Sequence, residues 1–310
     1  MAGPEPNPFH PLPHCTMPSR LFHRLAATLF FIAASALWTS AIAQLGTKTT
    51  GQGTSVVTTP YVRAELLAHA PQGVAPGQPL WLGLQITHQP EWHTYWKNPG
   101  DSGLPTELTW QLPAGLDAGD IAWPVPHKIA IGTLANYGYE GTVLLPVPVT
   151  VTQTFAPGPL AKDVTVQLKA SWLVCRKECI PEEGHFTLQL PIQSTTALHS
   201  AAFDAAQKAQ PQPLAKASAQ QQAQVDGDAL QVRVAGLPAA LRGKTLDLFP
   251  ETPEVLHNAA EGTQRWEGDV WTARIPLAEQ RSNSPSTLPV VLAERVQGSV
   301  PRPGYRADLT

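Results

Sequence analysis

Apolar and polar residues alternate with a period of two in several short segments of the chain. From position 80 to 86, the even positions carry Leu, Leu, Leu and Ile, whereas the odd positions carry Trp, Gly and Gln. Such a period places alternate side chains on opposite faces of a β-strand. The same alternation predicts strands at residues 143–151, 164–172, 186–190, 230–234, 246–248, 271–275 and 290–292. Because Pro- and Gly-bearing turns separate these strands, the pattern predicts an antiparallel β-sandwich.

Composition divides the chain into five segments. We expect an N-terminal extension with a signal peptide at 1–43, a flexible lead-in at 44–60, a first sandwich at 61–195, an Ala- and Gln-rich linker at 196–224 and a second β domain at 225–310. A short helix is expected in the linker, around Ala201 to Ala209, before Pro211 and Pro213 interrupt it. A length of 310 residues is enough for two domains, each with its own core.

The N-terminus carries the features of an export signal. Basic residues at positions 20, 23 and 24 precede an apolar run at 25–38, and small residues at 41 and 43 form a cleavage site before Gln44. We therefore expect cleavage after Ala43 and export of the mature chain to the periplasm. An uncleaved anchor is the alternative. Translation from Met17 rather than Met1 would give a signal peptide of ordinary length.

Charge and proline content exclude two classes of protein. The chain has 21 basic and 24 acidic residues, a net charge of −3, so the sequence predicts no nucleic-acid partner. It has 32 prolines, which are disfavoured inside helices, so a helical bundle is excluded.

Export changes the meaning of the three cysteines. Cys15 precedes the apolar run and would be removed with the signal peptide, which leaves Cys175 and Cys179. Two nearby thiols in an oxidising compartment indicate a disulfide. Cys175 falls near the end of the predicted strand, and Pro181 and Gly184 are expected to end the turn that follows. The pair is therefore expected at the exposed tip of a hairpin, with Cα atoms about 5–6 Å apart.

The cysteine pair admits a structural and a redox interpretation. Closing a loop of about five residues stabilises a fold by only about 2 kcal/mol, which is little for a purely structural bond. Arg176 and Lys177 would favour a thiolate, whereas Glu178 opposes it. Spacing alone does not decide between these two interpretations.

Two other chemistries, metal binding and sugar stacking, have candidate residues in the sequence. His88, His93, His127 and His185 could join the thiols as ligands for Cu(I) or Zn, but no short Cys/His cluster of zinc-finger spacing occurs, so no metal site and no cofactor are assigned. Trp92, Tyr95 and Trp96 could form a sugar-stacking platform, but such residues more often pack in the core or at its rim.

Three ordered motifs carry a resemblance to a known family. Residues 92–105 (WHTYWKNPGDSGLP), 136–141 (NYGYEG) and 172–183 (WLVCRKECIPEE) resemble the amino-terminal domain of the DsbD thiol:disulfide interchange family, in its ScsB-like branch. The resemblance covers residues 61–195, and residues 225–300 resemble more weakly the extra β domain of that branch. It implies an immunoglobulin-like sandwich followed by a second, smaller β domain.

The resemblance also implies a function, namely a component of a periplasmic protein-disulfide reductase relay. Its donor would be a membrane or thioredoxin-like electron-transfer protein. We expect this donor on a separate polypeptide, whether the chain is a stand-alone protein or a truncated or split version of a longer one; otherwise the relay is incomplete. Its acceptor would be an exported disulfide-bearing protein. Cys179 would form the mixed disulfide, and Cys175 would resolve it.

A mobile cap loop over the thiols is a further implication of the resemblance. It corresponds to residues 133–141, with Tyr137 or Tyr139 as the shielding aromatic side chain and Gly138 and Gly141 as hinges. The branch is associated with copper tolerance. Two alternatives stay open: a non-enzymatic binding module with a structural disulfide, and a periplasmic copper-binding protein.

Overall fold

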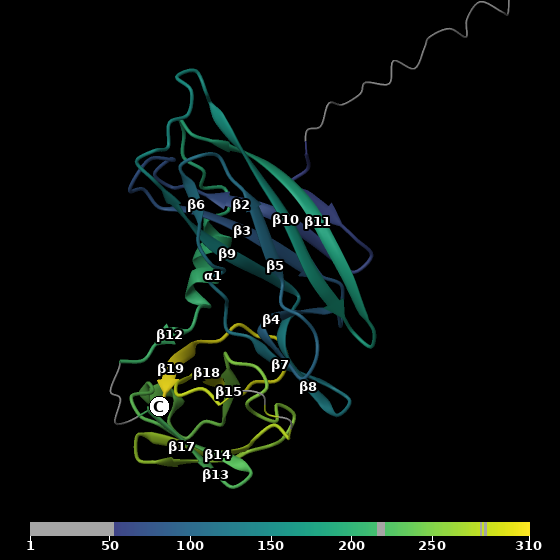
Figure 1. Ribbon diagram of the computed structural model, residues 1–310, viewed down its shortest axis with the longest axis vertical. Helices are drawn as coiled ribbons and strands as arrows, with labels where there is room; N and C mark the ends of the chain where they lie inside the picture. Colours follow the sequence, from purple (N-terminus) through teal and green to yellow (C-terminus); the bar gives the residue numbers. More distant parts are fainter. Residues whose placement is uncertain (1–52, 216–220, 280, 282–283) are drawn as a thin grey trace, which may run out of the picture. The chain divides into compact units, whose positions relative to one another are not determined.

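The computed structural model describes residues 53–215, 221–279, 281 and 284–310 (Figure 1). The expected signal peptide, its cleavage site and Cys15 lie outside the described residues. In the part of the chain that is described, no helix combines the length and the apolar character needed to cross a membrane.

Two antiparallel sheets form the first β-sandwich. The five-stranded sheet has the order β1 (Val56–Thr58), β2 (Val62–His69), β3 (Leu80–His88), β9 (Thr142–Val151), β6 (Leu116–Ala118). The six-stranded sheet has the order β11 (Cys179–Pro191), β10 (Asp163–Cys175), β4 (His93–Gly100), β8 (Leu134–Glu140), β7 (His127–Ile131), and β5 (Glu107–Gln111) pairs with β10. The immunoglobulin-like antiparallel sandwich expected from the sequence is therefore confirmed.

The alternating segments of the sequence form the strands that build the core. The apolar residues at even positions of β3, among them Leu82 and Leu84, are buried, and they belong to the same cluster as Trp172 and Phe186 of the opposite sheet. Burial of alternate side chains is what a strand with one face on a core requires. All the strands predicted from periodicity are present.

The β10–β11 hairpin is longer than the sequence predicts. Its two strands of 13 residues run side by side, paired from Asp163–Pro191 to Cys175–Cys179 (Figure 1). The expectation that Pro181 and Gly184 end the turn is wrong, because β11 runs through both residues. An edge strand tolerates proline, since its outer N–H groups have no ladder partner.

The second β domain consists of two four-stranded sheets. One has the order β12 (Gln212–Pro213), β19 (Gly304–Leu309), β18 (Leu288–Glu294), β15 (Leu246–Pro250), and the other β13 (Gln221–Asp226), β14 (Ala229–Val234), β17 (Val270–Pro276), β16 (Thr263–Glu267). Among the pairings between named strands in the described residues, only the short β12–β19 pairing is parallel. Val232, Trp271 and Leu292 lie in its core. A 3₁₀ helix, η2 (Ala239–Leu241), follows β14.

The segments expected to be a linker and a lead-in contain regular structure. Helix α1 (Ser200–Lys208) confirms the predicted short helix, and its Phe203 packs with Leu67 and Leu144 of the sandwich. β12 and the first residues of β13 also fall within 196–224, and β1 falls within 44–60.

The sandwich and the second β domain share buried contacts. Phe249, Val291 and Ala293 of the second domain belong to the core cluster of the sandwich. Arg302 is also buried, and it contacts His127 at 2.8 Å and Asp247 at 3.4 Å. These contacts place the second domain against β7 and β8, in the sheet that also contains the cysteine hairpin.

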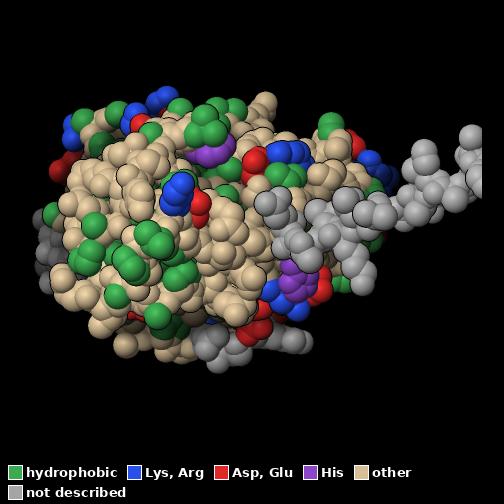
Figure 2. Space-filling model, turned by 90° about the horizontal axis from the view of Figure 1, so that it is seen from above, with side chains coloured by type: hydrophobic (Ala, Val, Ile, Leu, Met, Phe, Trp, Pro, Cys, Tyr) green, Lys and Arg blue, Asp and Glu red, His purple; other side chains and the backbone are tan. Residues whose placement is uncertain are grey.

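Charged side chains of both signs are interspersed on the surface. On the face shown in Figure 2, Lys and Arg side chains lie beside Asp and Glu side chains. Exposed ion pairs such as Arg63–Glu65 and Lys169–Glu183 illustrate this mixing. The small net charge is therefore not gathered into a single patch on that face.

Candidate active site

The two cysteines form a disulfide at the tip of the β10–β11 hairpin. Cys175 ends β10 and Cys179 begins β11, directly opposite each other, and their sulfur atoms are bonded. Their Cα atoms are 4.2 Å apart. This distance is shorter than the expected separation of about 5–6 Å. The two cysteines form a direct cross-strand pair, and the closest pairs of this kind have Cα atoms about 4.5 Å apart.

The two cysteines differ in exposure. Cys175 is 1% exposed, whereas Cys179 is exposed. The difference in exposure follows from the strand order. Strand β10 lies between β11 and β4, with Cys175 opposite His93 of β4, whereas β11 lies at the edge of the sheet. The expectation of an exposed pair is therefore correct for Cys179 and wrong for Cys175. A partner can reach one residue of the disulfide from solvent.

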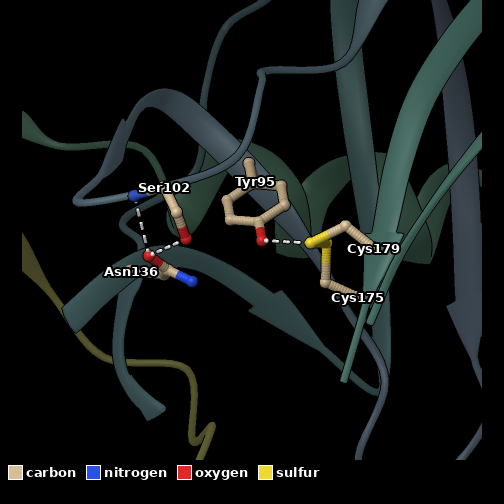
Figure 3. Close-up of a disulfide and its surroundings, with 5 residues drawn as sticks. All are labelled: Tyr95, Ser102, Asn136, Cys175 and Cys179. Carbon is tan, nitrogen blue, oxygen red and sulfur yellow. Dashed lines mark hydrogen bonds between the residues drawn. A yellow bond between two sulfur atoms is a disulfide. The ribbon is translucent and has the colours of Figure 1, made fainter. Parts of the chain in front are cut away.

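Tyr95 of β4 is the tyrosine whose hydroxyl lies at the disulfide. Its oxygen is 3.5 Å from the Cys179 Sγ (Figure 3). Trp96 of the same strand belongs to the sandwich core, so Tyr95 points to the opposite face of the sheet. Tyr95 is nevertheless fully buried. Burial raises the pKa of its hydroxyl, and a hydrogen bond with Ser102 opposes that shift.

Residues 101–105, which we call the covering segment, bury Tyr95 on that face. A Cβ atom at Gly103 would overlap the Tyr95 ring, so the backbone lies directly on the ring. The φ angle of Gly103 is +100°, which also favours glycine. Asn136 of β8 holds the segment, because its Oδ1 accepts hydrogen bonds from Ser102 N at 3.2 Å and Ser102 Oγ at 3.0 Å (Figure 3).

His93 stands beside both Tyr95 and Cys175. Its ring meets that of Tyr95 edge-on, with centroids 5.1 Å apart, and cross-strand partners such as His93 and Cys175 share one face of a sheet. His93 is 1% exposed, and its Nε2 has no hydrogen-bond partner. Burial lowers the pKa of His93 to about 4, so the imidazole is neutral at pH 7.

The other candidate histidine ligands lie in separate surroundings. His88 is buried, with its ring nitrogens 2.8 Å from Gly141 O and 3.0 Å from Thr94 Oγ1, and burial lowers its pKa to about 4. His127 contacts Arg302, and His185 is exposed beside Glu183. Among the described residues, no group of three or more His, Cys, Asp or Glu side chains is arranged to hold a metal ion.

Tyr137 and Tyr139 do not occupy a cap loop. Residues 134–140 form β8, which pairs with β4 on one side and β7 on the other. Both tyrosines are 3% exposed, and their hydroxyls donate to Asn258 Oδ1 and Pro124 O. The structure therefore places them in the interior, and the tyrosine whose hydroxyl contacts Cys179 is Tyr95. Gly138 is a strand residue rather than a hinge, since a Cβ there would overlap Thr94 O.

The positive charge next to the cysteines is partly engaged. Arg176 contacts Glu91 at 3.3 Å, and its guanidinium lies 5.5 Å from the Trp92 ring centroid. An exposed ion pair of this kind contributes little stability. Arg176 is therefore shared between Glu91, Trp92 and any thiolate formed at the tip.

Tyr95, Ser102 and Asn136 are the residues of this site that sequence reasoning missed. The sequence predicts Tyr95 as a packing residue, and it assigns no role to Ser102 or Asn136. Their only signal is that they fall within the first two of the three family-like motifs, at 92–105 and 136–141. The contacts themselves depend on the β4–β8 and β4–β10 pairings, which a local pattern does not reveal.

Comparison with known proteins agrees with this site. The family model "Thiol:disulfide interchange protein DsbD, N-terminal" matches residues 63–191, which include both cysteines, Tyr95 and the covering segment. No curated protein matches the sequence.

A solved structure shares the fold. The N-terminal periplasmic domain of ScsB from Proteus mirabilis aligns with a TM-score of 0.59 and 14% sequence identity, over 83% of this chain and 97% of that one. At this identity the likeness concerns the fold alone. Residues 63–191 of this chain therefore match the family of DsbD N-terminal domains, on a fold shared with the ScsB periplasmic domain.

Proposed function

We propose that this chain is a component of a protein-disulfide reductase relay that works outside the cytoplasm. One observation carries the proposal: the Cys175–Cys179 disulfide has one buried and one exposed residue at the tip of a hairpin. Thiol–disulfide exchange requires that a thiolate approach one sulfur in line with the bond to the other. The match of residues 63–191 to the DsbD N-terminal family supports thiol–disulfide interchange in general.

Reduction of this chain begins at the exposed sulfur. A donor thiolate attacks Cys179 Sγ, the Cys175–Cys179 bond breaks, and its electron pair stays on the Cys175 sulfur, which takes up a proton. The donor's second thiolate then attacks the donor sulfur of the mixed disulfide and releases Cys179. Two electrons and two protons have then passed to this chain, and the donor holds a disulfide.

Delivery to the acceptor runs through the same atoms. The Cys179 thiolate attacks the acceptor disulfide and forms a mixed disulfide, while the acceptor's other sulfur leaves as a thiolate. The Cys175 thiolate attacks Cys179 Sγ, which restores the internal disulfide and releases the reduced acceptor. Cys175 can resolve the intermediate because it already faces Cys179 across the hairpin.

The partners follow from this chemistry and from the expected location. We propose a thioredoxin-like or membrane electron-transfer protein as donor and an exported disulfide-bearing protein as acceptor. The signal-peptide features of residues 1–43 and the periplasmic origin of the similar ScsB domain support a periplasmic site of action. In this proposal residues 61–195 form the redox domain, and residues 225–310 form the second domain.

A trapped intermediate tests the proposal. In a Cys175→Ser variant, Cys179 is activated with 5,5′-dithiobis(2-nitrobenzoate) and mixed with reduced thioredoxin that retains only its attacking cysteine. We expect rapid release of thionitrobenzoate and a disulfide-linked heterodimer through Cys179, located by peptide mass so that Cys15 is distinguished. The matched Cys179→Ser variant should give no heterodimer through Cys175, because that residue is buried. A structural disulfide would instead leave the wild-type Cys175–Cys179 bond closed when reduced thioredoxin that retains both of its cysteines is added.

A further inference from the structure

We propose that Asn258 of the second β domain is a positioning residue that fixes the covering segment over Tyr95, whose hydroxyl lies at Cys179. The inference rests on the proposed exchange at Cys179 and assigns a task to the second domain in it. Asn258 does not touch the sulfur atoms; it acts through Asp101, the first residue of the covering segment.

Asn258 uses both ends of its amide across the two domains. Its Nδ2 donates to Asp101 Oδ1 at 2.9 Å, and its Oδ1 accepts from the Tyr137 hydroxyl at 2.9 Å. The side chain is 8% exposed, so water competes little for these bonds. Both partners belong to the sandwich, whereas Asn258 lies between β15 and β16 of the second domain.

Tyr137 fixes which way the amide faces. Burial raises the pKa of the Tyr137 hydroxyl, and the nearby Asp101 and Asp247 carboxylates raise it further, so the hydroxyl keeps its proton and acts as a donor. A donor selects the amide oxygen, and this leaves Nδ2 directed at Asp101. The carboxylate of Asp101 therefore accepts a hydrogen bond from the amide N–H of Asn258.

Asp101 connects Asn258 to the disulfide through the residues that follow it in the covering segment. Its other oxygen, Oδ2, accepts from Ala135 N at 2.8 Å, so the carboxylate bridges the second domain and β8. Ser102 follows and is held by Asn136, and Gly103 lies on the Tyr95 ring. The hydroxyl of that ring is the group 3.5 Å from Cys179 Sγ.

A second contact from the same domain holds the chain just before the covering segment. Asn98 Nδ2 donates to Pro250 O at 2.7 Å, and Asn98 Oδ1 accepts from Gly100 N at 3.1 Å. The neighbouring Phe249 packs edge-on against Tyr137, with ring centroids 5.0 Å apart. The second domain therefore restrains the backbone on the approach to the segment and again at Asp101.

The test measures access to Cys179 directly. In the full-length chain with Cys175→Ser, the rate at which iodoacetamide labels Cys179 is followed by peptide mass, which separates this residue from Cys15. Asn258→Asp keeps an oxygen that accepts from Tyr137, but it replaces the amide donor to Asp101 with a second carboxylate. The hydrogen bond to Asp101 is then lost, and the two carboxylates repel each other. We expect labelling to accelerate about three- to tenfold, the factor that corresponds to the loss of one ordinary buried hydrogen bond.

A reciprocal exchange provides the rescue. Asp101→Asn alone sets two amides against each other and should also accelerate labelling. Asn258→Asp combined with Asp101→Asn exchanges amide and carboxylate: the new carboxylate accepts from Tyr137 and from the new amide, whose oxygen accepts from Ala135 N. The double variant should therefore label at nearly the rate of the Cys175→Ser parent, a coupling that a double-mutant cycle measures.

A control separates this effect from general loosening between the domains. Ser299→Ala removes a different interdomain hydrogen bond, to Glu140 Oε2, and should leave labelling of Cys179 unchanged. The inference would be overturned if both single variants labelled at the rate of the Cys175→Ser parent, or if the double variant labelled faster than either single variant. Because labelling needs one thiol and no redox partner, its outcome is independent of whether the disulfide exchanges with other proteins.

Discussion

The Cys175 and Cys179 side chains are four positions apart in the chain, but they have different neighbours. Cys175 lies between two strands and faces His93, whereas Cys179 lies on an edge strand and faces the Tyr95 hydroxyl and solvent. In an exchange reaction the accessible sulfur accepts the attack and the buried sulfur leaves. The division of roles implied by the family resemblance therefore has a physical basis in the strand order.

Histidine burial predicts a pH dependence of stability at the residue scale. His88 has a pKa of about 4 in the folded protein, below its ordinary value of 6.5, because burial disfavours the charged ring. The unfolded chain then binds more protons between these values, so stability is complete above about pH 6.5 and is lost as the pH falls toward 4. The loss amounts to at most about 3 kcal/mol for this residue.

The variant His88→Gln isolates this contribution. Glutamine can still donate to Gly141 O and accept from Thr94, but it carries no titrating group. Urea denaturation at pH 7.5 and pH 4.5 should show a smaller difference for this variant than for the wild type. His185→Gln is the matched control, because His185 is exposed; equal pH dependence in all three proteins would contradict the assignment.

At the scale of elements, the covering segment depends on a glycine. Alanine at Gly103 must adopt a positive φ angle and displace the Tyr95 ring. Gly132→Ala is the matched control, because Gly132 also has a positive φ, of +60°, but has no atom within 4 Å of a Cβ. We expect Gly132→Ala to cost about 1–2 kcal/mol from backbone strain alone.

Gly103→Ala should cost about 1–3 kcal/mol more than the control, because the ring must move or the segment must lift. It should also accelerate reduction of the Cys175–Cys179 bond by dithiothreitol, followed by mass spectrometry. Equal stability and equal reduction rates for the two variants would show that the segment does not press on Tyr95.

Local pattern predicted most elements and part of the site. The strands follow from the alternation of apolar and polar residues within single segments. The two cysteines of the hairpin are only four positions apart, so their pairing can also be predicted from neighbouring residues. Tyr95 reaches Cys179 across 84 positions, and Ser102 reaches Asn136 across 34. Such contacts depend on which strands become neighbours, and periodicity does not determine that order.

The misplaced cap shows the same limit. The family resemblance implies a mobile loop at 133–141 with Gly138 and Gly141 as hinges, yet Gly138 is required for the close approach of β8 to β4. Its neighbours Tyr137 and Tyr139 are buried in the core cluster of the sandwich, and their hydroxyls donate to Asn258 of the second domain and to Pro124 O. The extension of β11 through Pro181 likewise depends on its edge position, which the sequence does not reveal.

At the scale of the whole described structure, the two β domains share a core. Phe249 is fully buried and contacts Tyr137 and Trp96 of the sandwich, so removing its ring opens a cavity at the junction. We expect the wild type to unfold in one calorimetric transition. Phe249→Ala should lose about 3–5 kcal/mol and unfold in two transitions.

Leu309→Ala is the control for this prediction, because Leu309 lies in the core of the second domain alone. It should lower the stability of that domain without removing contacts at the junction. Two separate transitions in the wild type would show that the shared contacts do not couple the domains.

Equilibration of the oxidised chain with glutathione redox buffers, followed by trapping and mass analysis, tests most directly whether the Cys175–Cys179 bond is exchangeable. The relay predicts a reduction potential above about −300 mV, with Cys175 and Cys179 both labelled in the reduced form. A bond that remains closed below about −300 mV would identify a structural disulfide and contradict the proposed relay.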